Sequence, residues 1–470
     1  MSKEQTSSAK IADGARIDII GNANNYPLAL AHGLRCLGYD AHLHLTMPHL
    51  LNAPENRYPM YADAYPEWIH DWRNLSDTLW SSPAMIEAVR QGSASADALI
   101  LNYDAVSLGA TETRPYFCLL TGTDLVYYAD PRAIKGEFVP PDISVLEHYP
   151  NRAYVRNWVE FCLRQRSAIR QAEGYSFFPR GHFQQADEVL TSLGASPERQ
   201  LSLLLSETDE LAFSPSQPGD CLRVIYGARL TWDRTAKPSW SDLDYKGSDT
   251  FLRGFADFVQ QGGMAELTLF RKGAHVRQTE EMVGALGISA SVRWSDELNQ
   301  QDFLDALRAA DVVVDQIGKS HVGMVVTDSM SLGRPVIATA PNYKAWNWPT
   351  PLPICHADNA EDVAVWLNKL ASNPVLRDEI ASQARNFAEE HFSPSSVARR
   401  LVASLRQSAL RQEISLFQTL KACGAYDKKD HNAHETLRLE HENLLHEGIK
   451  NTAKRLARKV LKRFFRIVRP

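Results

Sequence analysis

Three groups of charged and small residues in the second half of the chain suit the binding of a diphosphate and a ribose. They lie at 226–230, 246–247 and 321–328. Arg229 can bind a phosphate through two parallel hydrogen bonds, and Lys246 adds a point charge. A glycine at position 323 lets a phosphate approach backbone amides closely. Asp328 can accept hydrogen bonds from both hydroxyls of a ribose, so the set predicts a nucleotide site.

Fixed cations of this kind also suit one class of reaction. A diphosphate gains charge when the bond between a sugar and a phosphate breaks. Cations and a helix N-terminus stabilise that charge. Arg229 and Lys246 are therefore predicted to act in catalysis as well as in binding.

The elements that must position these groups are apolar strands alternating with amphipathic helices. Strands are expected at 16–22, 41–45, 96–102, 116–122, 221–230, 266–270, 290–294, 311–317 and 335–340. Helices are expected at 24–38, 151–172, 247–261, 278–286, 301–310, 324–332 and 360–371. Residues 48–95 look irregular, and 206–220 has the composition of a linker. Alternation of this kind favours parallel sheets covered by helices.

The predicted fold is therefore α/β, with two Rossmann-like doubly wound domains that face a cleft. We expect the first domain at 15–205, the second at 221–390, and C-terminal helices with a basic tail at 391–470. A chain of 470 residues is too long for one compact core, which agrees with two domains. Ligands of doubly wound sheets bind at the carboxyl ends of the strands, so the cleft is the expected site.

Composition narrows the class of protein. The net charge of -5 gives no global case for nucleic-acid binding. The six cysteines are scattered without zinc-site spacing, which is typical of reduced, mostly buried thiols in a cytosolic protein. The N-terminus lacks the apolar core of a signal peptide, and no apolar run reaches the roughly 18 residues of a spanning helix.

The order of the three groups resembles the retaining GT-B glycosyltransferases of family 4, in a bacterial form. Their pattern runs GRL, KG, then E-x7-E followed by AMAxGxPV. This chain reads GARL at 227–230, KG at 246–247 and SMSLGRPV at 329–336. ADVVVDQIG at 310–318 is similar to a bacterial branch of the family, and 21–43 is similar to its acceptor-domain opening. The resemblance implies that Arg229 and Lys246 bind the donor diphosphate and that Asp328 holds the ribose.

The chain also departs from that pattern. The first Glu of E-x7-E falls on Ser320, so the resemblance places Ser320 and His321 beside the donor sugar. Thr121 stands where the family has an active-site His, and nearby Asp124 becomes the first-domain candidate for orienting the acceptor or the reacting sugar.

The first βα turn adds two further candidates. Gly21 and Asn22 are predicted to contact the diphosphate or the acceptor, with a tight turn as the alternative. The resemblance further implies front-face transfer, in which the donor phosphate itself accepts the acceptor's proton. Such transfer needs little base catalysis from the protein.

No metal or other cofactor is expected. Asp242 and Asp244 form a DxD, which binds a divalent metal in another transferase class, but GT-B catalysis is independent of metal. Four histidines at 431, 434, 441 and 446 lie in a charged helical stretch without ligand spacing, so we interpret them as a solvated face.

Residues 450–470 are strongly basic. They hold nine Lys or Arg and no acidic residue, with apolar residues at helical spacing. A basic amphipathic helix of this kind suits an anionic membrane surface, and docking on this protein or a partner is the alternative. We therefore expect a cytoplasmic protein, peripheral on the inner face of the cell membrane.

The functional hypothesis is transfer of a sugar from a nucleotide-sugar donor to a glycan or lipid-linked acceptor, in cell-surface polysaccharide or glycolipid synthesis. Two alternatives remain open. A nucleotide-sugar epimerase of GT-B architecture would need an acid/base set of carboxylates and histidine in the cleft. A catalytically silent glycan-binding or assembly subunit would bind ligand without turnover, and Ser320 and Thr121 suggest it.

Overall fold

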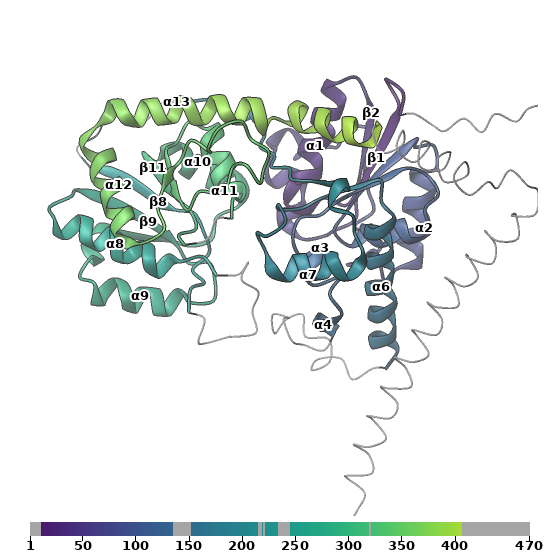
Figure 1. Cartoon of the computed structure of the whole chain (residues 1–470), viewed down its shortest axis with the longest axis horizontal. Coiled ribbons are helices and arrows are strands. Elements are labelled where there is room, and N and C mark those ends of the chain that lie inside the picture. Colours follow the sequence, from purple (N-terminus) through teal and green to yellow (C-terminus); the bar gives the residue numbers. More distant parts are fainter. Residues whose placement is uncertain are drawn as a thin grey trace, which may run out of the picture. The chain divides into compact units, whose positions relative to one another are not determined.

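The computed structural model describes residues 11–134, 152–214, 219, 221–233, 245–318 and 321–406 (Figure 1). The described residues all belong to one compact unit. The predicted DxD, the four histidines at 431–446, the basic tail at 450–470 and Ser320 lie outside the described residues.

The first domain contains a parallel sheet of seven strands in the order β3-β2-β1-β4-β5-β6-β7. The strands are β1 (Arg16–Ile20), β2 (Asp40–Leu45), β3 (Ile69–Asp71), β4 (Ala98–Asn102), β5 (Tyr116–Leu119), β6 (Gly174–Ser176) and β7 (Gln200–Leu201). Central strand β4 is buried along its whole length, because helices cover both faces of the sheet. The predicted parallel sheet is thus confirmed.

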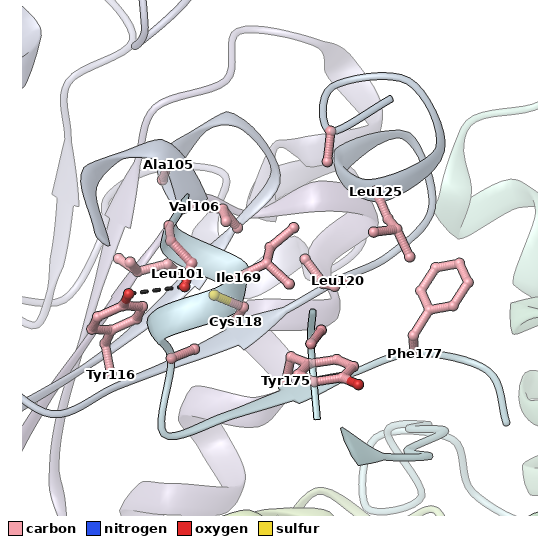
Figure 2. Packing of buried hydrophobic residues seen from close by; sticks show 14 of the residues in the cluster. Leu101, Ala105, Val106, Tyr116, Cys118, Leu120, Leu125, Ile169, Tyr175 and Phe177 are labelled. Carbon is pink, nitrogen blue, oxygen red and sulfur yellow. Dashed lines mark hydrogen bonds between the residues drawn. The ribbon is translucent and has the colours of Figure 1, made fainter. Parts of the chain in front are cut away.

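Two apolar cores lie on the two faces of this sheet. Alternate residues of β4 point to opposite faces, so Leu99 and Leu101 join one core while Ala98 and Ile100 join the other. The first core is completed by α2 (Pro83–Gly92), the 3-10 helix η5 (Tyr103–Thr111), α3 (Thr123–Val126), α6 (Arg152–Gln171) and α7 (Gln184–Leu193). Figure 2 shows part of it, where Tyr116 donates a hydrogen bond of 2.8 Å to the carbonyl of Ala168 on α6.

The second domain has a parallel sheet of six strands in the order β10-β9-β8-β11-β12-β13. The strands are β8 (Leu222–Tyr226), β9 (Ala265–Phe270), β10 (Val292–Ser295), β11 (Val312–Val314), β12 (Val336–Ala338) and β13 (Cys355–His356). Its helices are α8 (Ser248–Gln260), α9 (Val276–Ala285), α10 (Gln300–Ala309), α11 (Met324–Ser331), α12 (Ala360–Ser372) and α13 (Pro374–His391). The expected alternation of strands and helices is thus confirmed. In a parallel sheet of this kind, the loops that follow the strands lie together at the carboxyl edge.

The chain after α13 returns to the first domain. Val397, Leu401 and Leu405 are buried in the core that contains α1 (Tyr26–Cys36). Gly33 of α1 allows this contact, since a Cβ there would lie 2.1 Å from the carbonyl oxygen of Pro394. Residues 391–406, predicted as the start of a separate C-terminal region, thus complete the first domain.

Residues 48–95, predicted to be irregular, contain regular structure. They form edge strand β3, helix α2 and short 3-10 turns at Leu50–Asn52, Pro54–Asn56 and Pro59–Tyr61. Helix α2 begins at a Ser82 cap, whose side chain accepts a hydrogen bond from the amide of Met85. The frequent aromatic residues of the segment conceal this order from a search for periodicity.

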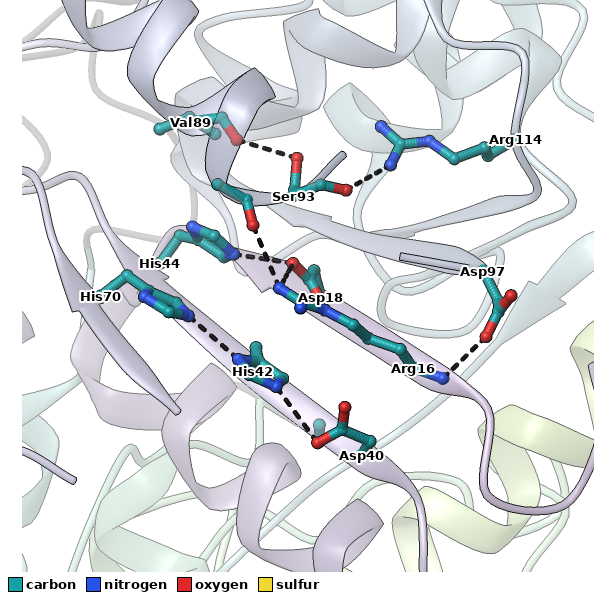
Figure 3. A network of polar contacts seen from close by, with 12 residues as sticks. Arg16, Asp18, Asp40, His42, His44, His70, Val89, Ser93, Asp97 and Arg114 are labelled. Atoms are coloured by element: carbon teal, nitrogen blue, oxygen red, sulfur yellow. Dashed lines mark hydrogen bonds and ion pairs between the residues drawn. The ribbon is translucent and has the colours of Figure 1, made fainter. Parts of the chain in front are cut away.

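Polar side chains form a network on the face of β1, β2 and β3 (Figure 3). Trp72 donates to Nδ1 of His44, so the His44 proton lies on Nε2 and is donated to Asp18 over 2.9 Å. His70 stacks on His44 with ring centroids 4.7 Å apart. Burial, followed by the neighbouring imidazoles, lowers the pKa of His70 to about 4. The ring of His70 is therefore packed as a neutral group.

Three further properties concern the described part of the chain. Its five cysteines are all free thiols, and two of them, Cys36 and Cys221, are exposed. Among these residues no helix is both long enough and apolar enough to cross a bilayer. The same ranges contain no group of three His, Cys, Asp or Glu side chains that could hold a metal ion.

Candidate functional site

Arg229 and Lys246 meet at the carboxyl edge of the second sheet. Arg229 follows strand β8 and is exposed. The amide of Lys246 donates a 2.8 Å hydrogen bond to the carbonyl of Thr231, two residues beyond Arg229. The two predicted phosphate-binding cations therefore stand on neighbouring loops.

Gly247 fixes where Lys246 enters helix α8. Its φ of +66° is in the left-handed region, and a Cβ would lie 2.1 Å from the carbonyl oxygen of Ile317. The amide of Ile317 in turn donates to the carbonyl of Lys246 over 3.3 Å. The KG pair thus holds the helix start tightly against the end of β11.

Two residues that the sequence analysis did not select lie beside Lys246. The ammonium of Lys246 donates to Oε1 of Gln316 over 3.1 Å, and Nε2 of Gln316 donates to the carbonyl of His321 over 3.4 Å. Burial raises the pKa of Asp315 to about 6, while the charge of Lys246 opposes this shift. Gln316 therefore joins the second group of the predicted site to the third. The signal that could have pointed to both residues was the Asp-Gln pair at 315–316, which lies in the segment similar to a bacterial branch of the resembled family.

Helix α11 begins at the same edge. Gly323 is its N-cap, with an ordinary φ of -112°, and a Cβ there would meet only Nε2 of Gln316 at 3.9 Å. Gly227, at the end of β8, lies so close to this helix that a Cβ would be 2.5 Å from Val325. The first turn of α11 therefore stands directly over the loop that carries Arg229, as an anion site requires.

Asp328, on the same helix, is buried in an ion pair with Arg57 of the first domain. Nη1 and Nη2 of Arg57 lie 3.2 and 3.1 Å from the two carboxylate oxygens, and Ser206 donates to Oδ1 over 3.0 Å. The residue predicted to hold a ribose thus has both oxygens engaged by protein groups. Arg57 was missed because nothing in the sequence links positions 271 residues apart.

A second buried network continues from Arg57 into the linker between the domains. Tyr58 donates a hydrogen bond to Glu207, which also contacts Nδ1 of His32 at 3.1 Å. Nε2 of His32 lies 2.8 Å from the hydroxyl of Tyr61. Residues 57–61 therefore contact the start of the predicted linker at Glu207 and helix α11 at Asp328.

His321 lies in an aromatic cluster rather than beside Arg229. Its Nδ1 is 3.0 Å from Nε2 of His182, and its ring centroid is 3.9 Å from that of Phe183. Both partners belong to the first domain, and His321 is buried. The described contacts thus favour a packing role for His321 over the predicted place beside the donor sugar. Ser320, its neighbour, lies outside the described residues.

Asp124 organises the turn after β5 instead of facing solvent. Its carboxylate accepts hydrogen bonds from the amides of Thr121, Gly122 and Leu125, and it is fully buried. Burial raises the pKa of Asp124 to about 6, while these amides oppose the shift. Both oxygens are occupied by the turn, so the described contacts give Asp124 a role in shaping this turn, while its contact with acceptor or sugar stays a prediction.

Gly21 and Asn22 shape the first βα turn. Gly21 has φ +93°, and a Cβ there would lie 2.5 Å from the carbonyl oxygen of Asn102. Nδ2 of Asn22 donates to Oδ1 of Asn25 and to the carbonyl of Asn52, both over 2.7 Å, and its Oδ1 accepts from the backbone amide of Leu28. The side chain of Asn22 is thus used within the turn, which supports the tight-turn interpretation for both residues.

Two surface hollows lie elsewhere in the first domain. They measure about 250 and 230 Å³ and share Arg90, Leu108 and Thr111 in their linings. They are bounded by α2 and η5, whereas the cations of the predicted site stand at the carboxyl edge of the other sheet. We therefore place the candidate site by its chemistry and not by these hollows.

Comparison with known proteins shows similarity to a family model, to a characterised relative and to solved structures. Residues 241–387 match the family model of glycosyl transferases group 1. The MMP alpha-(1->4)-mannosyltransferase of Mycolicibacterium hassiacum is 26% identical over 266 residues, which are 55% of this chain and 59% of that enzyme. The matched region thus spans little more than half of that relative.

Solved structures share the fold of the whole unit. The structure of HepE from Anabaena in complex with UDP and glucose has a TM-score of 0.52 at 15% identity, covering 84% of this chain and 100% of that one. A glycosyltransferase from Rickettsia africae has a TM-score of 0.53 at 10% identity, covering 84% of this chain and 99% of that one. At such identities the likeness concerns the two-domain architecture.

Proposed function

From the premise that this GT-B chain carries a glycosyl transferases group 1 domain at residues 241–387, we propose that it transfers a sugar from a nucleotide-sugar donor. One observation carries the proposal. Arg229, Lys246 and the start of α11 lie at one edge of the second sheet, and the last two are inside the matched region.

The donor is bound mainly by the second domain. Arg229 and Lys246 hold the diphosphate, whose charge grows as the bond to the sugar breaks, and the α11 N-terminus adds backbone donors. Asp328 binds the ribose. Transfer proceeds with retention, the donor phosphate accepting the proton of the attacking hydroxyl. The relative from Mycolicibacterium hassiacum is named a mannosyltransferase, so mannose is a sugar to test first.

The sharpest test is a thermal-shift screen of the full chain against UDP, GDP, ADP, CMP and dTDP. At least one nucleotide should raise the melting temperature, because a ligand that binds only the folded state stabilises it. Arg229→Ala should abolish the shift. Arg277→Ala, which removes an exposed arginine of α9, is the matched control and should leave it intact. A panel without any shift would contradict the proposed donor site.

The acceptor is proposed to be a glycan or a lipid-linked glycan at a membrane surface, for synthesis of cell-surface polysaccharide or glycolipid. The nine basic residues of 450–470 support this proposal. The full chain should sediment with anionic liposomes but not with neutral ones, and deletion of 450–470 should abolish the sedimentation with anionic liposomes. Equal sedimentation of the full and truncated chains would remove the membrane part of the proposal and leave the donor site untouched.

The second candidate function is a catalytically silent binding subunit. It is favoured by Thr121 and Ser320, which stand where the resembled family has its His and its first Glu. Turnover separates the two candidates. Nucleotide sugars are tested for each base whose nucleotide shifts the melting temperature. Binding without hydrolysis or transfer of any of these donors would favour the silent subunit.

A further inference from the structure

Arg57 reaches from the first domain to the carboxylate that the proposed donor site needs. It lies in the segment 54–61, between two 3-10 turns. Its two terminal nitrogens face the two oxygens of Asp328 at 3.2 and 3.1 Å, and the side chains are only 5% and 6% exposed. The pair is thus bidentate and removed from water.

The guanidinium and a ribose would compete for the same atoms. A carboxylate offers about four in-plane lone-pair positions, and two parallel N–H groups of an arginine occupy two of them. Ser206 occupies a further position on Oδ1. A single position is left for the two hydroxyls of a ribose, so a nucleotide can bind both of them at Asp328 only if Arg57 withdraws.

We propose that Arg57 is a positioning residue of the donor site, which holds Asp328 while the site is empty and is displaced by the ribose of the nucleotide. The inference rests on the proposed function, because it takes Asp328 as the ribose-binding carboxylate. Arg57 is the residue through which nucleotide binding reaches the first domain.

The consequence extends beyond the ion pair. Tyr58, next to Arg57, is hydrogen-bonded to Glu207, and the adjacent Ser206 is bonded to Asp328. Release of Arg57 therefore loosens segment 54–61 at the linker that joins the two domains. A buried pair of this type has two discrete states, made or broken, which is what a binding signal requires.

The test is calorimetric titration with UDP, GDP and ADP in turn. Arg57→Gln keeps one N–H donor toward Asp328 but removes the charge, and it should tighten binding of the recognised nucleotide by about tenfold. That factor corresponds to a wild type in which Asp328 is accessible in about one molecule in ten. Arg57→Lys should be intermediate, since lysine lacks the planar fork.

Arg114→Gln is the matched control. Arg114 pairs with Glu112 at 2.7 Å in the first domain, remote from Asp328, and its loss should leave nucleotide affinity unchanged. Equal affinity of wild type and Arg57→Gln, or weaker binding by the variant, overturns the inference while the donor site stands. A lack of binding by every protein overturns the proposed function and the inference with it.

A measurement on the wild type keeps the inference testable even if the variants do not fold. Hydrogen exchange is measured with and without saturating nucleotide. The backbone amides of Arg57 and Tyr58 donate to the carbonyl of Pro54, and residues 54–61 should exchange faster in the nucleotide complex than in the free protein. Unchanged or slower exchange of this segment in the nucleotide complex would show that Arg57 stays in place, and would refute its displacement.

Discussion

Replacement of Lys246 by alanine should lower kcat/KM for sugar transfer by about 10²- to 10³-fold, the usual cost of one fixed group that stabilises developing charge. The ammonium is held by Gln316 at 3.1 Å and stands near the ionisable Asp315, so its position is set before the donor arrives. The initial rate of transfer, measured with the recognised donor, checks the prediction.

Lys369→Ala provides the control for this experiment. Lys369 lies on α12, with its ammonium 4.7 Å from the ring centroid of Trp366, and its removal changes the charge of the second domain equally. Transfer should be unaffected by it. A Lys246→Ala enzyme that keeps wild-type kcat/KM, with the same melting temperature, would show that the diphosphate is held elsewhere.

Replacement of Gly247 by alanine should destabilise the protein by about 2–5 kcal/mol and abolish most of its activity. The φ of +66° alone costs an alanine about 1–2 kcal/mol. Contact of the new Cβ with the carbonyl oxygen of Ile317, at 2.1 Å, adds overpacking that costs typically about 1–3 kcal/mol. Denaturant unfolding and transfer assays check both parts.

Gly287→Ala separates the two causes. Gly287 has φ +70°, almost the same as Gly247, but no heavy atom lies within 4 Å of the position of its Cβ. Its replacement should therefore cost only the conformational part, about 1–2 kcal/mol. If the two variants lose equal stability, the close approach of Gly247 to β11 does not constrain the helix start.

The elements of the second domain could be predicted from the sequence because its helices and strands alternate regularly. Strand β9 and helices α8 and α10 begin within one or two residues of the positions expected for them. In the first domain β3 and α2 were not predicted, since aromatic and proline residues obscure the periodicity of 48–95. Local patterns succeed where local spacing determines the element.

The candidate site divides in the same way. The position of Lys246 and Gly247 at the carboxyl edge could be predicted because it depends on adjacent residues and a strand end. Asp124 was interpreted as a ligand contact, whereas its surroundings turn it into a buried turn residue. Arg57 could not be identified from the sequence, because its role depends on its ion pair with Asp328 in the other domain.

The return of the chain after α13 has a consequence for how the protein is made. The core around α1 is incomplete until Val397, Leu401 and Leu405 have packed onto it. A ribosome delivers these residues only after the whole second domain, so the first domain must wait with an apolar face uncovered during most of synthesis. A protein truncated after the second sheet would therefore lack part of the core of its first domain, although the sequence of that domain up to α1 and its sheet is intact.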